Sequence, residues 1–146
     1  MTQLVLPNDT NQLSNLLGGQ LMHWIDLVAA IAAARHSQRV CVTASVDDLN
    51  FLHPIKIGEV VTLQASVNRV FRTSMEVGVK VLSENLLSGK IKHANTAYLT
   101  FVALDSDGNP TQVRQVICET EEEQRRFEDA QYRREQRLLR RKKLIQ

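Results

Sequence analysis

Aromatic residues and cysteines are both scarce in this sequence of 146 residues. Phe, Trp and Tyr together make up 5% of the chain, so the core must be built mainly from Val, Leu, Ile and Ala. The two cysteines, Cys41 and Cys118, form no CxxC pair and have no histidine cluster around them. This pattern favours free thiols in a reducing compartment and argues against a metal site.

Long hydrophobic runs are also missing. No stretch reaches the roughly 18 charge-free apolar residues that a membrane-spanning helix needs. Residues 1–12 do not show the basic and then apolar pattern of a secretory signal. We therefore expect a cytoplasmic protein without a membrane span. The sequence also has no phosphate-binding loop, no GxSxG motif and no dinucleotide-binding fingerprint.

Most of the chain has no excess of either positive or negative charge. Residues 1–118 contain 9 basic and 9 acidic residues, whereas residues 119–146 contain 9 basic and 7 acidic ones. A neutral body argues against a nucleic-acid-binding surface, which needs a basic face. Nucleic acid is therefore not an expected partner.

Residues 18–36 predict a helix that is apolar on nearly all sides. Gly18 and Gly19 open it, and Asp26 is the one charged residue between positions 21 and 34. A helix of this kind needs cover on most of its surface. Because a single sheet covers only one side, we expect a second copy of the chain to cover much of the rest.

After this helix the hydrophobic pattern changes to alternation with a period of two, which is typical of strands. Turn residues such as Pro54 and Gly58 separate the alternating segments. The first segment places Val40, Val42 and Val46 on one face. One buried helix followed by four or five antiparallel strands predicts an α+β domain over residues 1–118. The alternating segments are residues 39–49, 60–71, 75–83 and 91–104.

The tail, residues 119–146, is predicted to be a charged helix. Acidic residues precede basic ones by four positions, as in Glu121 and Arg125, which supports a helix by about 0.3 kcal/mol per pair. Apolar residues are too sparse for a coiled coil. We expect a solvated, fraying helix; the alternative is a basic clamp for phosphates or nucleic acid.

Three features could carry chemistry. Asp26 lies in a helix made for burial, where an unpartnered carboxylate is costly, so it is a candidate general base or nucleophile; the alternative is a partnered or interface-exposed structural residue. Gly18 and Gly19 expose backbone N–H groups at a helix N-terminus, which suits a developing oxyanion, and Asn15 could add an amide donor. They could equally form a tight turn.

The third feature is Arg72, which lies between two predicted strands and is followed by Thr73 and Ser74. Lys90 and Lys92 begin the last strand and could offer positive charge nearby. An ordinary polar hairpin has the same appearance.

The order of these motifs resembles the hot-dog-fold acyl-CoA thioesterases, in particular the branch of cytosolic acyl-CoA hydrolases. The resemblance covers roughly residues 4–113 and includes "NLLGGQLMHWIDL", "FLHPIKIG", "RTSMEV" and "TAYLTFVALDSDG". Its most specific part is Asn-x-x-Gly-Gly with Asp seven residues after the second glycine. Ser14, His23 and Trp24 depart from the family pattern.

The resemblance implies a long helix wrapped by a curved antiparallel sheet of five or six strands, in a homodimer that forms a trimer of dimers. Asp26 matches the catalytic acid, Asn15 the catalytic amide or acid, and Gly19 the backbone N–H that holds the thioester carbonyl. Asn15 would face the partner's Asp26. No cofactor is implied beyond CoA as part of substrate and product. The residues that would bind CoA are Gly18, Arg72, Thr73, Ser74, Lys90 and Lys92.

The predicted function is therefore hydrolysis of fatty acyl-CoA to free acid and CoA. A non-catalytic acyl-CoA sensor of the same fold is the main alternative, because fold alone does not decide function. A hot-dog dehydratase is a weaker one, since His23 lies on the wrong side of the glycine pair for that chemistry.

Overall fold

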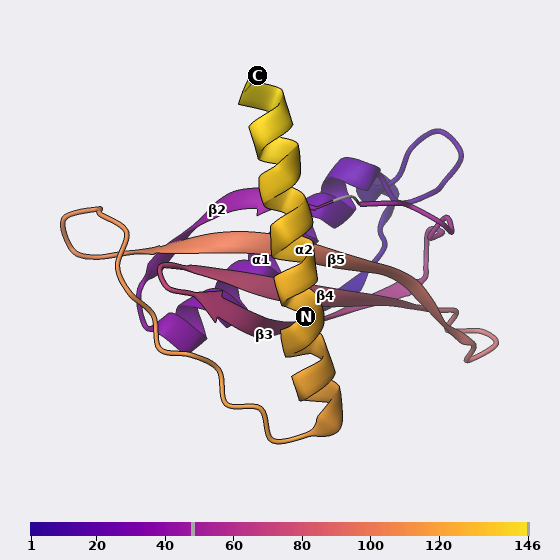
Figure 1. The fold of residues 1–146 in the computed structure, drawn as a ribbon. Helices are drawn as coiled ribbons and strands as arrows, with labels where there is room; N and C mark the ends of the chain where they lie inside the picture. The colour runs from indigo at the N-terminus through magenta and orange to yellow at the C-terminus, as the bar shows by residue number, and fades with distance from the viewer. Residues whose placement is uncertain (48, 146) are drawn as a thin grey trace.

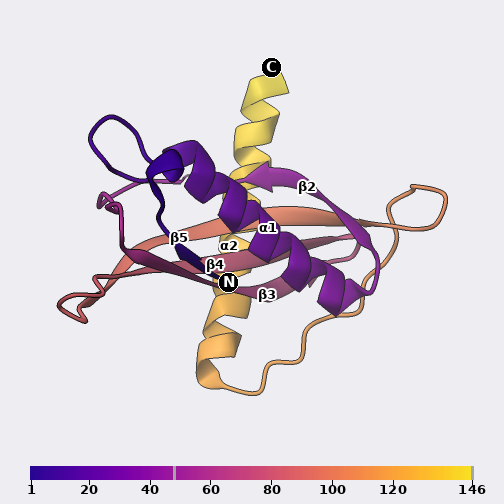
Figure 2. The same ribbon diagram turned by 180° about the vertical axis from the view of Figure 1, so that it is seen from behind.

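The computed structural model describes residues 1–47 and 49–145, which form a five-stranded antiparallel sheet with one helix on each face (Figures 1 and 2). The strand order is β1-β3-β4-β5-β2. The predicted α+β fold with a curved sheet around one helix is confirmed. The elements are β1 (Thr2–Leu4), the 3-10 helix η1 (Pro7–Asp9), α1 (Gly18–Ser37), β2 (Val40–Val46), β3 (Val60–Phe71), β4 (Ser74–Glu84), β5 (Ile91–Leu104) and α2 (Glu121–Ile145).

Helix α1 packs on the sheet through residues spaced four apart. Leu21, Ile25, Ala29 and Ala33 are all at most 3% exposed, because side chains four positions apart lie on the same face of a helix. The helix ends at Gln38, whose left-handed backbone (φ 55°) stops the helical repeat. Only this face and Trp24 are buried, so the opposite face of α1 stays uncovered within one chain.

Alternation along the strands divides their side chains between the two faces of the sheet. The inward residues of β4, Met75, Val77, Val79 and Val81, are fully buried beneath α1. In β2 the inward positions are Cys41 and Thr43, which contact residues of α1. Val40 and Val42 therefore face outward, and Val40 is 72% exposed. The prediction of a single valine face is wrong for Val46, because a bulge between Thr43 and Ser45 shifts the register and pairs Val46 with the inward-facing Leu99. The sequence had not indicated β1, which pairs with the start of β3.

Helix α2 crosses the outer face of the sheet (Figure 1). It starts over β3, where the Arg69 guanidinium lies 3.9 Å from the ring centroid of Phe127 and donates a hydrogen bond to the Phe127 carbonyl. Ala130 is completely buried. The prediction of a solvated helix is therefore wrong for this part of α2. Docking relies on cation–π and ionic contacts, which a count of apolar residues does not detect.

A buried ion pair fixes the middle of α2. Arg133 donates hydrogen bonds to both carboxylate oxygens of Glu76, at 2.9 and 2.7 Å, and its guanidinium lies 3.6 Å from the ring centroid of Tyr98. Glu76 is fully buried on β4 and also accepts a hydrogen bond from Asn68. Burial by itself lowers the pKa of Arg133, but hydrogen bonding and the charge of Glu76 outweigh it and raise the pKa.

The end of β2 is tied to the same helix. Arg137 lies 3.2 Å from the carboxylate of Asp47, the residue that follows β2. Burial raises the pKa of Asp47, and the positive charge of Arg137 only partly opposes this shift. Each of α2's ionic anchors therefore joins it to a different strand of the sheet or its end.

We predict that Arg133→Ala destabilises the fold by about 3–5 kcal/mol, because it leaves the buried Glu76 carboxylate without its partner. Arg125→Ala, which removes an exposed ion pair on the same helix, should cost less than about 1 kcal/mol. Urea unfolding measures both. Adding Glu76→Gln to Arg133→Ala should recover part of the loss, and equal effects of the two single variants would contradict the prediction.

The raised pKa of Asp47 predicts a specific dependence of stability on pH. The folded protein keeps the Asp47 carboxyl group protonated at a pH where the same group in the unfolded chain has lost its proton. The contribution of Asp47 is therefore complete below about pH 4 and decreases as the pH rises through the folded pKa. Unfolding free energies of the wild type and Asp47→Asn, compared from pH 3 upward, should show a wild-type advantage that declines in this window. A rising difference would refute this.

Candidate active site

Asp26 lies in the middle of α1 beside β2, and it is half-buried. The Thr43 hydroxyl donates a 2.8 Å hydrogen bond to Asp26 Oδ1. Thr43 reaches the helix because alternation turns it to the inner face, opposite to the outward-facing Val42. Sequence reasoning missed this threonine, although its position opposite the valine face was the available signal. One carboxylate oxygen of Asp26 is thus held in place by β2.

The N-terminus of α1 presents backbone donors without helical acceptors. The first hydrogen bond of the helix runs from the Leu21 N–H to the Leu17 carbonyl, and no side chain of the described residues caps this end. The N–H groups of Gly18 and Gly19 therefore lie at the positive end of the helix dipole. A Cβ at Gly19 would meet nothing within 4 Å, so a ligand can approach closely.

A cavity of about 310 Å³ lies against this helix end. Asn15 lines it, and its Oδ1 atom is buried without a hydrogen-bond partner among the described residues. Phe51 lies across the same cavity, where its ring would be 3.4 Å from a Cβ at Gly18. The other lining residues are Leu16, Leu21, His53, Pro54 and Ile55. The structure thus brings Asn15 and Gly18 together in a mostly apolar recess.

Asp26 is not part of this recess within one chain. It lies seven residues beyond Gly19, and at 1.5 Å per residue this is about 10 Å along the helix. The carboxylate and the helix N-terminus are therefore two separate half-sites in the single chain.

The loop before α1 is organised by Asn11. Its Oδ1 accepts hydrogen bonds from the backbone N–H groups of Leu13 and Asn15, and its own N–H donates to the Asn15 carbonyl. Ser14 has a left-handed backbone (φ 60°) inside this turn. Asn11 thus sets the direction in which Asn15 enters the recess, a position that sequence reasoning had not singled out.

The predicted CoA-binding residues occupy opposite ends of the sheet. Arg72 and Thr73 form the turn between β3 and β4, with Arg72 in the left-handed region (φ 66°), and Ser74 begins β4. Lys90 and Lys92 lie at the other end of β4, about 33 Å away at 3.3 Å per residue. The expectation that these charges lie near one another is wrong within one chain.

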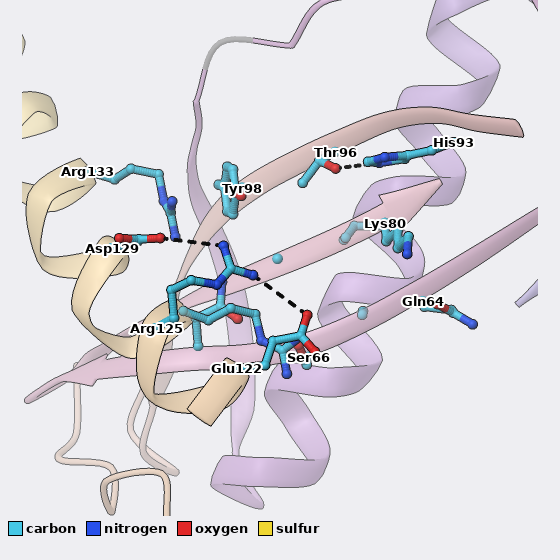
Figure 3. Close-up of a pocket in the computed structure, with 15 residues that line it drawn as sticks. Gln64, Ser66, Lys80, His93, Thr96, Tyr98, Glu122, Arg125, Asp129 and Arg133 are labelled. Carbon is cyan, nitrogen blue, oxygen red and sulfur yellow. Dashed lines mark hydrogen bonds and ion pairs between the residues drawn. The ribbon is translucent and has the colours of Figure 1, made fainter. Parts of the chain in front are cut away.

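A polar groove of about 530 Å³ lies on the outer face of the sheet beside α2 (Figure 3). Arg125 extends between Glu122 and Asp129, at 3.6 and 3.9 Å. His93 Nε2 lies 2.7 Å from the Thr96 hydroxyl. Because acidic residues of α2 compensate Arg125, this part of the helix does not support the alternative of a basic clamp.

Residues 1–47 and 49–145 contain no group of three or more His, Cys, Asp or Glu side chains placed to hold a metal ion. None of the helices in these ranges has the length and apolar character that crossing a membrane requires.

Known proteins provide an independent comparison. The model of the thioesterase superfamily matches residues 13–89. The uncharacterized acyl-CoA thioester hydrolase YkhA of Bacillus subtilis is 51% identical over 122 residues, which are 84% of this chain and 71% of that protein. A crystal structure of an apo-hexameric acyl-CoA thioesterase is 43% identical with a TM-score of 0.92, covering 96% of this chain and 90% of that one.

A third similar protein is the acyl-CoA hydrolase of Staphylococcus aureus, solved in complex with butyryl-CoA, CoA and CoA disulfide. It is 39% identical with a TM-score of 0.93, covering 99% of this chain and 88% of that one. It was also solved with an asparagine, an aspartate or a threonine changed to alanine. That asparagine lies 15 residues before the aspartate, and the threonine 17 residues after it. Asn11, Asp26 and Thr43 have the same spacing in this chain.

The family model covers more than half of the chain, and the similar structures extend over nearly all of it, α2 included. The chain therefore belongs to the thioesterase superfamily and, within it, to the hot-dog-fold acyl-CoA thioesterases.

Proposed function

We propose that the protein hydrolyses the thioester of fatty acyl-CoA to a free acid and CoA, with Asp26 as general base or nucleophile. The observation that carries the proposal is the Thr43–Asp26 hydrogen bond on an otherwise apolar helix. This carboxylate is oriented by a hydroxyl, and within the described residues it forms no ion pair with a cation. A sensor that only binds acyl-CoA needs no such group.

Two routes are compatible with this arrangement. In one, Asp26 takes a proton from water, and the resulting hydroxide adds to the thioester carbon. In the other, Asp26 itself attacks that carbon and water then hydrolyses the acyl anhydride. In both, the C–S bond breaks, the sulfur leaves as thiolate and takes up a proton, and the acid is released.

The carbonyl oxygen gathers negative charge in either route. We assign its stabilisation to the Gly19 N–H at the N-terminus of α1, with Asn15 as a side-chain donor in the same recess. The spacing shared with the Staphylococcus aureus hydrolase makes Asn11 a second candidate for the asparagine. Asn11 is the residue that holds Asn15 in place, so its replacement would also affect the recess.

The two half-sites fit together only between chains. Leu27 and Ile31 on the open face of α1 are 42% and 45% exposed, and β2 is an edge strand beside them. Exposed apolar surface next to an open strand edge is typical of an interface. We propose a homodimer through α1 and β2, with Asn15 facing the partner's Asp26, and a trimer of dimers as in the hexameric relative. A cytoplasmic location stays a prediction.

The same assembly accounts for the predicted CoA residues. Since Arg72–Ser74 and Lys90–Lys92 lie at opposite ends of one sheet, they can bind a single CoA only if they come from different subunits. Gly18, at the entrance of the recess, would adjoin the thioester end of the bound substrate.

Asp26→Ala should leave a folded oligomer but abolish hydrolysis of acyl-CoA, because the carboxylate that activates water or attacks the thioester is gone. Release of CoA thiol from acetyl-, butyryl- and palmitoyl-CoA measures this. Thr43→Val should lower kcat about ten- to a hundred-fold through the lost charged hydrogen bond, while Thr43→Ser retains most activity. More than a tenth of wild-type activity in Asp26→Ala would refute the assignment.

Asn15→Ala should be milder than Asp26→Ala, with kcat lowered about 10²–10³-fold as for one lost oxyanion donor. Asn11→Ala, assayed in parallel, decides which asparagine is the donor. If Asn15 donates directly, Asn15→Asp should be as impaired as Asn15→Ala, because a carboxylate cannot donate. Full activity of Asn15→Ala together with loss in Asn11→Ala would transfer the role to Asn11.

A further inference from the structure

The last two turns of α2 project beyond the β2 edge of the sheet (Figures 1 and 2). Along its length α2 contacts β3 through Phe127, then Glu76 of β4 and Tyr98 of β5 through Arg133, and finally Asp47 through Arg137. β2 is the edge of the sheet. The helix continues past this edge for residues 138–145, a length of about 12 Å.

The projecting segment carries apolar side chains that are uncovered in the single chain. Leu144 is 87% exposed and Ile145 is 78% exposed. Leu144 follows Arg137 by seven residues, nearly two full turns, so it points to the same side as the sheet-facing Arg137. Leu139, two residues after Arg137, points to the opposite side. The sheet-facing stripe of α2 therefore extends beyond the sheet of its own chain.

The outer face of β2 carries a matching apolar strip. Val40 and Val42 point outward, on the face of the sheet that α2 occupies, and are 72% and 45% exposed. They lie at the start of the strand, whereas α2 leaves the sheet at Asp47, beyond its end. The separation from Asp47 along β2 is about 23 Å for Val40 and about 17 Å for Val42 at 3.3 Å per residue, too far for α2 to cover these valines in its own chain.

Antiparallel pairing of two β2 edges would close this gap. It brings the end of each β2 beside the start of the other, so α2 would pass directly over the first residues of the partner's strand. Strands are spaced about 4.8 Å apart, so a projection of about 12 Å reaches across roughly two of them. The partner's Val40 and Val42 lie within that reach.

Charge supports the same placement. The projecting segment has four consecutive basic residues at positions 140–143, and no acidic residue follows Glu135. In the sheet, Val40 pairs with Leu104, and the next turn contains Asp105 and Asp107. The basic end of α2 would therefore meet an acidic turn beside the partner's valines.

We propose that residues 138–145 of α2 form a clamp that packs on the outer face of the partner subunit, with Leu144 and Ile145 on the partner's Val40 and Val42. The clamp and the α1–β2 contact would hold the dimer from opposite faces of the joined sheet. This inference rests on the β2-edge dimer and not on the hydrolysis reaction.

Cross-linking tests the clamp. In a Cys41→Ser, Cys118→Ser background, Val40→Cys combined with Leu144→Cys should give a covalent dimer with a short bismaleimide, seen as a band of twice the chain mass. Within one chain the two thiols are too far apart to react. The matched control is Val40→Cys with Leu139→Cys, whose second thiol points away and should cross-link at most a tenth as efficiently.

Sedimentation of the same variants separates the outcomes. A dimer or hexamer that cross-links only through Leu144→Cys supports the clamp. An oligomer that does not form the cross-link, or whose control variant cross-links equally well, overturns the clamp and leaves the dimer proposal standing. A monomer overturns both proposals.

Thiol labelling of Val40→Cys gives a second measurement. The labelling should become at least fivefold faster when residues 138–146 are deleted, because the clamp no longer covers this position. Unchanged labelling, or binding of this segment to phosphatidylserine vesicles instead, contradicts the proposal.

Discussion

The structure depends on the single row of contacts through which α1 packs on the sheet. Leu21, Ile25, Ala29 and Ala33 bury one face of the helix, and the small alanines allow close approach near its C-terminal half. This choice of face decides the rest of the site. It turns Asp26 toward β2 and Thr43, and it leaves Leu27 and Ile31 facing outward. A rotation of α1 by one residue would bury the carboxylate or remove its hydrogen bond.

The two faces of the sheet are covered by different kinds of interaction. On the inner face, apolar side chains pack with α1. On the outer face, α2 is held by the Glu76–Arg133 pair and the contact of Arg133 with the Tyr98 ring. Ionic contacts with this geometry set the position of a helix along and across the sheet, because they are directional. The result is that α2 leaves the sheet at a defined point, beside Asp47.

The sequence predicted the α+β fold and its family well because both depend on local patterns. The helical and alternating periods marked α1 and four of the strands, and the motif from Asn15 to Asp26 carried the resemblance. Pairing of β1 with β3, the hydrogen bond from Thr43 and the docking of α2 were missed. Each joins residues that are distant in the chain, and a local pattern does not say which distant partner a residue meets; alternation along β2 indicated the direction of Thr43 but not its contact with Asp26. The roles assigned to Asp26, Asn15 and Gly19 stay predictions.

The sequence by itself determined which groups the protein has: one carboxylate on an apolar helix, a glycine pair at the start of that helix, and a charged C-terminal helix. Local propensity and hydrophobic spacing suffice for this, since both act between near neighbours. Only the tertiary structure decided which groups meet. It placed Thr43 on Asp26, separated Arg72 from Lys90 and Lys92, and laid α2 across the sheet. These outcomes follow from strand register and from the direction of each side chain, which are set by packing over the whole domain.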